Sequence, residues 1–334
     1  EFAVGRASQK SPVKAYYALE KPGQKWHIHG YITLIGCYLL MMFYTTVAGW
    51  MLHYFYLTAT GKFTGLDSDA VASQFNTMLS QPQVMGFWMV LIVIAGILVC
   101  SIGLQNGLEK VTKIMMISLL FIMVILAINS FFMDGAKEGL SFYLIPDFER
   151  MKEIGIIKTI TGAMNQAFFT LSLGIGAMSI FGSYIGKERS LLGESLNIAL
   201  LDTFVAITSG LIIFPACFTF HVDQTSGPGL IFITLPNIFN HIPMGKLWGS
   251  LFFIFMSFAA FSTILAVFEN IISCGMELTG WSRKKSSFIN AIAIILLSVP
   301  CVLGYNLWSS DIFAVFGGAV LDFISGQVIK VEGL

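Results

Sequence analysis

Six uncharged apolar runs divide this chain, and each is long enough to cross a lipid bilayer. They cover residues 30–57, 84–104, 114–133, 203–221, 247–268 and 286–306. A helix needs about 20 apolar residues to span the hydrocarbon core of a membrane. Only helices and closed barrels satisfy their own backbone hydrogen bonds in lipid, and the alternating pattern of barrel strands is absent from these runs. The sequence therefore predicts an all-α, polytopic membrane protein.

Composition narrows the possible partners of this protein. Only 11% of the residues are charged and the formal net charge is zero, whereas soluble proteins carry about 25% charged residues. The chain has no basic patch with interleaved aromatic residues, so we expect no nucleic-acid partner. Five cysteines lie inside apolar runs, without the spacing of a metal site or of a disulfide framework. We interpret them as small packing residues.

A seventh uncharged run, residues 159–186, carries polar and flexible residues at its centre. Its sequence FFTLSLGIG places Thr170, Ser172, Gly174 and Gly176 at membrane depth. Glycine weakens a helix, and bare backbone in lipid is tolerated only beside protein or a water-filled cavity. One interpretation is a helix break at which a ligand or ion replaces the missing hydrogen bonds. The alternative is a small-residue face for helix packing.

Positive charges in short loops indicate the orientation of the helices. Five basic residues precede the first run, which places this opening segment in the cytoplasm. Successive crossings then give basic inner loops and mixed-charge outer loops, for seven full crossings and the start of an eighth. We expect residues 229–239, in one of two long outer loops, to form short helices over the outer face.

Three acidic residues lie within apolar surroundings: Asp202, Glu269 and Asp322. Ionisable residues in a membrane are costly and usually face a cavity or a partner. For Glu269 we favour a structural role, paired with a helix end in the core or with a polar group that lies outside this sequence.

Hydroxyl groups near Ala259 form a second polar cluster. Residues three and four positions apart share a helix face, so the carbonyl of Ala259 can meet the hydroxyls of Ser262 and Thr263. Hard oxygen ligands of this kind suit a small cation. The alternative is that both hydroxyls simply bond to carbonyls of their own helix, as serine and threonine often do.

Several segments together resemble the neurotransmitter:sodium symporters, in particular their bacterial amino-acid transporters. FFTLSLGIG, preceded by Asn165-Gln166, resembles the unwound sixth helix of that family. EFAVGR resembles the end of its second helix, GLSFYLIPDFERM the loop before helix six, GPGLIFITLP the fourth extracellular loop, and AAFSTILAVFE the eighth helix. The resemblance implies a leucine-transporter-type inverted-repeat fold. Residues 1–334 would form one transporter domain, from the end of the second helix to the start of the tenth. We interpret the chain as a fragment without the first and last helices.

The resemblance also implies roles for particular residues. The first sodium site would involve Thr170 and Asp202, and the second Ala259, Ser262 and Thr263. Gln166 and Asp322 would belong to the outer gate. The substrate would be bound by Leu40, Tyr44, Phe169, Thr170, Ser172, Ile175, Ile264 and Val267. In this set Tyr44 and Phe169 would form an aromatic lid, and the aliphatic residues favour a neutral, hydrophobic amino acid.

Asp202 departs from the family pattern, because many members have asparagine there and need chloride nearby. The usual chloride-ligand position corresponds to Ala206. A fixed carboxylate can both bind sodium and supply the negative charge that chloride provides elsewhere, so we expect no chloride requirement.

The sequence thus predicts a sodium-coupled amino-acid importer, with two sodium sites, in a bacterial inner membrane. A proton-coupled carrier in which Asp202 titrates is the alternative, as is a membrane receptor that binds substrate without transport. The chain contains no HExxH and no GxSxG motif, so an intramembrane enzyme is not expected.

Overall fold

A computed structural model describes residues 1–103, 108–219, 229–241 and 243–308, and the regular structure within these ranges is entirely helical. Within these ranges, six helices are long and apolar enough to cross a membrane, as the apolar runs predict. They are α3 (His27–Ala59), α5 (Pro82–Ile102), α6 (Lys110–Ser130), α11 (Leu191–Thr219), α13 (Gly245–Thr279) and α14 (Arg283–Leu303). Helix α11 begins ahead of its uncharged run, so Asp202 lies within the helix and not at its start.

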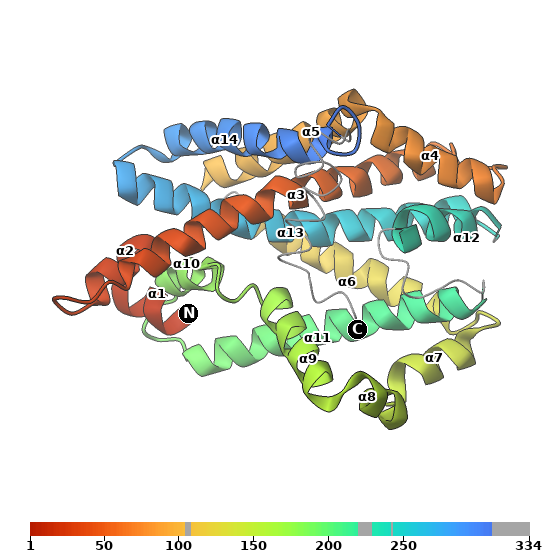
Figure 1. The fold of residues 1–334 in the computed structure, drawn as a ribbon, viewed down its shortest axis with the longest axis horizontal. Helices are drawn as coiled ribbons and strands as arrows, with labels where there is room; N and C mark the ends of the chain where they lie inside the picture. The colour runs from red at the N-terminus through yellow and green to blue at the C-terminus, as the bar shows by residue number, and fades with distance from the viewer. Residues whose placement is uncertain (104–107, 220–228, 242, 309–334) are drawn as a thin grey trace.

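Shorter helices gather at the two ends of this bundle. At one end lie α4 (Ser68–Ser80), α7 (Ala136–Leu144) and α12 (Leu235–His241), and at the other lie α1 (Phe2–Ser8) and α2 (Pro12–Leu19), as Figure 1 shows. This separation agrees with the predicted outer and inner loops. Residues of the 229–239 segment form the short π-helix η2 (Leu230–Thr234) and the start of α12, as expected.

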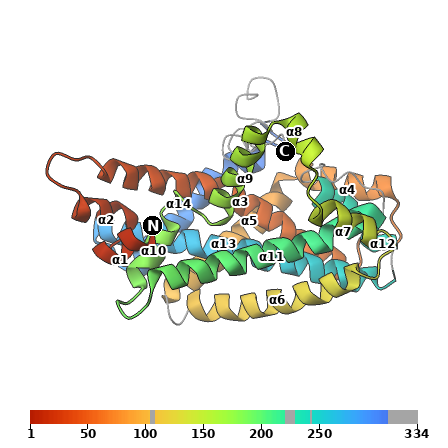
Figure 2. The same ribbon diagram turned by 90° about the horizontal axis from the view of Figure 1, so that it is seen from below.

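Helices α3, α5, α13 and α14 pack against one another and form the most continuous part of the core. Helix α6 packs against both α13 and α11, and Figure 1 draws it between them. A separate contact joins α1 to α10 (Ala177–Tyr184). The remaining helices, α8 (Phe148–Ile154) and α9 (Ile156–Thr170), run obliquely to the others (Figures 1 and 2).

Helix α7 rests directly on the backbone of α11. A Cβ atom at Gly139 would lie 2.6 Å from the backbone of Pro215, and one at Gly135 would lie 2.3 Å from the amide nitrogen of Thr219. The Tyr143 hydroxyl donates to the carbonyl of Ala206 at 3.3 Å. No larger residue fits at either glycine without moving the two helices apart.

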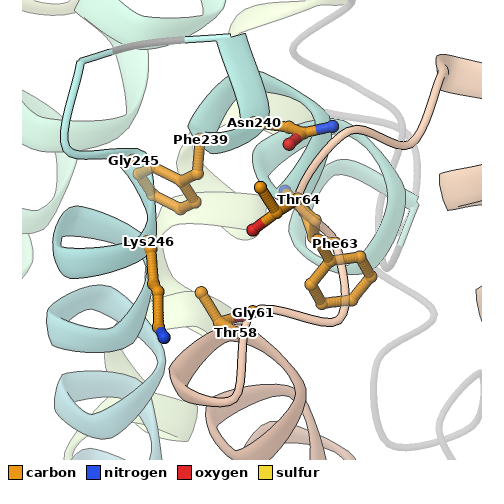
Figure 3. Close-up of a pocket in the computed structure, with 9 residues that line it drawn as sticks. Thr58, Gly61, Phe63, Thr64, Phe239, Asn240, Gly245 and Lys246 are labelled. Atoms are coloured by element: carbon orange, nitrogen blue, oxygen red, sulfur yellow. The ribbon is translucent and has the colours of Figure 1, made fainter.

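The outer loops are joined through Asn240 at the end of α12. Its side chain accepts a hydrogen bond from the Gly65 amide at 3.1 Å and donates one to the Leu66 carbonyl at 2.5 Å. Beside this contact is a cavity of about 20 Å³ whose wall includes Thr58 and Lys246 (Figure 3). That volume holds about one water molecule, so we assign this cavity to loop packing and not to a substrate.

Glu269 pairs with Arg283 near the inner ends of α13 and α14. The two guanidinium nitrogens lie 2.7 and 2.8 Å from the two carboxylate oxygens, and the Glu269 side chain has 0% exposure. Tyr184 of α10 also donates to this carboxylate, at 2.9 Å, and Arg283 donates to the carbonyl of Cys100 on α5 at 3.0 Å. Glu269 is therefore paired within this chain, but both expected partners were wrong: the partner is Arg283, which is neither a helix end nor a group outside the sequence.

Removal of one member of this buried pair should strongly destabilise the protein. We expect Arg283→Met to lower the free energy of unfolding by about 3 to 5 kcal/mol, because it leaves a buried carboxylate without a countercharge. The double variant Glu269→Leu with Arg283→Met should recover most of that loss. Thermal unfolding in detergent measures both effects.

The matched control for this prediction is Arg189→Met, because Arg189 pairs with Glu194 at 2.9 Å while its side chain remains 67% exposed. An exposed ion pair contributes little to stability, so the melting temperature should hardly change. Equal melting temperatures for the Arg283 and Arg189 variants would contradict the structural role of the buried pair.

Candidate functional site

A break separates α9 from α10 in the middle of the seventh apolar run. Helix α9 ends at Thr170 and α10 begins at Ala177, and the residues between them form turns. Ser172, Gly174 and Gly176 have φ angles of 52°, 89° and 77°. Such left-handed conformations are accessible to glycine without strain, which explains why the chain leaves the helix here. The predicted helix break is confirmed.

The break faces a cavity of about 580 Å³. This volume is typical of a small-molecule site, and the wall is mostly apolar. Helices α3, α6, α9, α11 and α13 supply the rest of the wall. Of the residues predicted to act at the site, the cavity is lined by Leu40, Tyr44, Gln166, Phe169, Thr170, Ser172, Ile175, Asp202, Ala259, Ser262 and Thr263.

Two predicted substrate contacts lie elsewhere. Ile264 and Val267 are 0% and 1% exposed and do not line the cavity. Ile264 packs toward α5, where its Cγ2 atom would lie 3.4 Å from a Cβ atom at Gly96. Contact between these two residues and a substrate therefore stays a prediction, because neither side chain reaches the cavity wall in this structure. The predicted gate residue Asp322 lies outside the described residues.

Asp202 of α11 is in direct contact with Thr170 of α9 at the cavity wall. The Thr170 hydroxyl donates to the two carboxylate oxygens of Asp202 at 3.1 and 3.2 Å. Asp202 carries the only formal charge among the described residues that line this cavity. A carboxylate and a hydroxyl in contact provide the hard oxygen donors that a small cation prefers.

The Ala259 cluster forms a second group of oxygens on the cavity wall. The hydroxyls of Ser262 and Thr263 lie 2.8 and 3.5 Å from the carbonyl oxygen of Ala259. Three oxygens thus converge as the spacing predicts. The hydroxyls also bond back to their own helix, so the geometry is compatible with both interpretations of the sequence.

Three further residues hold the break and were not singled out from the sequence. The Glu1 carboxylate accepts from the Gly174 amide at 2.6 Å. The carbonyl of Ile175 accepts from Asn270 and from Cys37, both at 3.1 Å. The sequence does contain one indication that Asn270 belongs near the site. It lies seven residues after Thr263 in an apolar helix, and this spacing places both residues on one face.

A broken helix beside an apolar cavity with two groups of oxygen ligands, within a bundle of membrane-length helices, defines a polytopic membrane transporter. The chain belongs to the sodium:neurotransmitter symporter family, whose family profile matches residues 70–320. It is therefore a sodium-dependent transporter and not an enzyme. The resemblance in the sequence is confirmed.

Relatives and a solved structure support this assignment. A sodium-dependent transporter of Bacillus subtilis (strain 168) is 32% identical over 335 residues, which cover 100% of this chain and 73% of that protein. A second, from Haemophilus influenzae (strain ATCC 51907 / DSM 11121 / KW20 / Rd), is 30% identical over 342 residues, or 98% of this chain and 74% of that protein. The crystal structure of MhsT in complex with L-phenylalanine matches 99% of this chain and 76% of its own, with a TM-score of 0.83 and 33% identity. The fold is thus of the leucine-transporter type.

Substitutions at two glycines of the break should differ in cost. A Cβ atom at Gly176 would lie 2.8 Å from the ring of Pro12, whereas one at Gly174 meets nothing within 4 Å. Alanine at either position costs about 1 to 2 kcal/mol for the left-handed conformation, but only Gly176→Ala adds a clash with a rigid ring. We expect the larger fall in melting temperature for Gly176→Ala. Equal falls would show that α2 does not pack tightly against the break.

Proposed function

We propose that this protein is a symporter that couples sodium entry to the import of a neutral, hydrophobic amino acid by alternating access. The observation that carries the proposal is one cavity in which the helix break, the Asp202–Thr170 contact and the Ala259 cluster meet. We place the protein in the inner membrane of a bacterium, in keeping with its bacterial relatives.

Two sodium sites follow from the two groups of oxygens. In the first, Asp202 and Thr170 would bind sodium beside the substrate, whose carboxylate the cation would attract. In the second, the carbonyl of Ala259 and the hydroxyls of Ser262 and Thr263 would exchange their contacts within α13 for sodium. Because the ions complete interactions across the break, sodium would favour the state that binds substrate.

The wall of the cavity supports an apolar substrate. Leu40 and Ile175 present aliphatic surface, and Tyr44 and Phe169 would close over the substrate as a lid. Gln166 would belong to the outer gate together with Asp322. We retain Ile264 and Val267 as contacts that would require α13 to rotate or the wall to rearrange. The bound L-phenylalanine in MhsT, a structural relative, is in keeping with this class of substrate.

We also propose that transport needs no chloride. Ala206, at the position expected for a chloride ligand, offers only a methyl group, and its carbonyl already accepts from Tyr143. Asp202 would supply the negative charge that balances sodium.

Uptake of a radiolabelled apolar amino acid into proteoliposomes tests sodium coupling. With the intact transporter, we expect uptake with sodium outside and little uptake when potassium replaces it. Equal uptake in the two salts would refute the coupling. Uptake driven by a proton gradient without sodium would instead favour a proton-coupled carrier, and binding without uptake would favour a receptor.

Loss of one hydroxyl should weaken sodium binding selectively. We expect Ser262→Ala to raise the sodium concentration for half-maximal uptake about tenfold, because a ligand to a charged ion is lost. Ser257→Ala is the matched control, since Ser257 bonds to its own helix at 2.7 Å and does not line the cavity. If both variants behave alike, the second sodium site lies elsewhere.

An asparagine at position 202 should change the chloride requirement. We expect the unsubstituted transporter to work equally well with chloride or gluconate, and Asp202→Asn to lose uptake in gluconate. Chloride should restore part of that uptake. Chloride-dependent uptake by the unsubstituted protein, or normal uptake by Asp202→Asn in gluconate, would contradict the proposed charge balance.

A further inference from the structure

The carbonyl of Ile175 stands at the inner edge of the helix break, one residue ahead of Gly176, the N-cap of α10. In the first turn of α10, the amides of Ser179 and Ile180 bond to the carbonyl of Gly176 and not to that of Ile175. A buried carbonyl without a partner would cost about 1 to 3 kcal/mol. Here the partners come from two other helices, α3 and α13.

Asn270 of α13 is the principal partner. Its amide nitrogen lies 3.1 Å from the Ile175 oxygen and 3.2 Å from the sulfur of Cys37, and Asn270 is 1% exposed. Cys37 of α3 is fully buried and also directs its thiol to the Ile175 oxygen at 3.1 Å. Since a thiol is a weak donor, the carboxamide supplies most of the hydrogen bonding at this point.

The residue that carries this carbonyl, Ile175, also forms part of the cavity wall. The side chain of Ile175 lines the cavity, whereas neither Asn270 nor Cys37 does. A peptide plane is rigid, so a carbonyl held in one direction also limits the orientation of the residue that bears it. Gly36 of α3 lies beneath Ile175, with 3.9 Å between its Cβ position and the isoleucine Cγ2 atom, which leaves space for the side chain to shift if the carbonyl is released.

We propose that Asn270 is a positioning residue for substrate selection. Its carboxamide fixes the Ile175 carbonyl, and this contact holds the isoleucine side chain as a firm wall that limits the size of the apolar substrate. The inference rests on the proposed function for the substrate class. The positioning of the break itself can be measured without transport.

Asn290 provides a matched control for a substitution at Asn270. It is also a buried asparagine, at 5% exposure, with hydrogen bonds to Tyr38 and Ser286, and it lies on α14 without contact to the break. Loss of either carboxamide should destabilise the fold to a similar degree. Only the change at Asn270 should alter the preference among substrates.

The first experiment measures sodium-driven uptake of alanine, valine, leucine and phenylalanine by the intact transporter in proteoliposomes. We expect Asn270→Ala to raise KM for the preferred amino acid about tenfold, the equivalent of one buried hydrogen bond. The KM ratios among the four substrates should become flatter, and the maximal rate should change little. Asn290→Ala should leave these ratios unchanged. Unchanged ratios in Asn270→Ala, or the same change in both variants, would overturn the selective role.

A rescue variant separates positioning from general packing. The hydroxyl of Cys37→Ser is a stronger donor than the thiol, so combining it with Asn270→Ala should restore part of the substrate preference. No recovery would count against the hydrogen bond as the cause. If Asn270→Ala does not fold, Cys37→Ala replaces it and should shift the KM ratios in the same direction, to a smaller extent. Unchanged ratios in that variant would also overturn the proposal.

Hydrogen–deuterium exchange of the purified protein tests the contact when transport is absent. Peptides that cover residues 171–180 should exchange about tenfold faster in Asn270→Ala than in Asn290→Ala. Equal exchange would overturn the positioning role. Faster exchange, in a protein whose unsubstituted form shows no sodium-driven uptake, would refute the proposed function while supporting the positioning of the break.

Discussion

A carboxylate with no exposed surface organises the inner half of this protein. A buried charge is tolerated only with a countercharge and further hydrogen bonds, so Glu269 requires Arg283, Tyr184 and their helices to come together. Through these partners α13 is joined to α14, α5 and α10. Asn270, the next residue, holds the other end of α10 through Ile175. Two consecutive side chains of α13 therefore fix both ends of the short helix that follows the break.

Helix α13 also carries the candidate ligands of the second sodium site. Ala259, Ser262 and Thr263 face the cavity about two to three turns before Asn270. The position of the break and that of the cation ligands are consequently set by one continuous helix. Any cation bound at Ala259 would stiffen the same element that supports Ile175. Helix α13 thus contributes both the oxygen cluster on the cavity wall and the hydrogen bond that holds the helix break.

The sequence predicted the features that depend on local chemistry, and it carried less information about contacts that depend on how neighbouring helices are rotated. Apolar runs predicted the membrane helices, and glycines beside hydroxyls predicted the break, because both signals lie within single segments. Ile264 follows Thr263 directly and was expected at the cavity, yet adjacent helical residues point about 100° apart and α13 has helices on several sides. Arg283 was assigned only to a basic inner loop. Its pairing with Glu269, like that of Asn270 with Ile175, depends on contacts between helices that no single segment encodes.

The close contact of α7 with α11 has a consequence for the break. Gly135 and Gly139 bring the backbone of α7 directly against that of α11, with no space for a larger side chain. The chain passes from α7 through α8 into α9, whereas α10 is held by α1 and α13. The two halves of the broken helix, α9 and α10, are thus attached to different parts of the protein. Residues 171–176 connect the two halves, so any relative motion of α9 and α10 would be concentrated at residues that face the cavity.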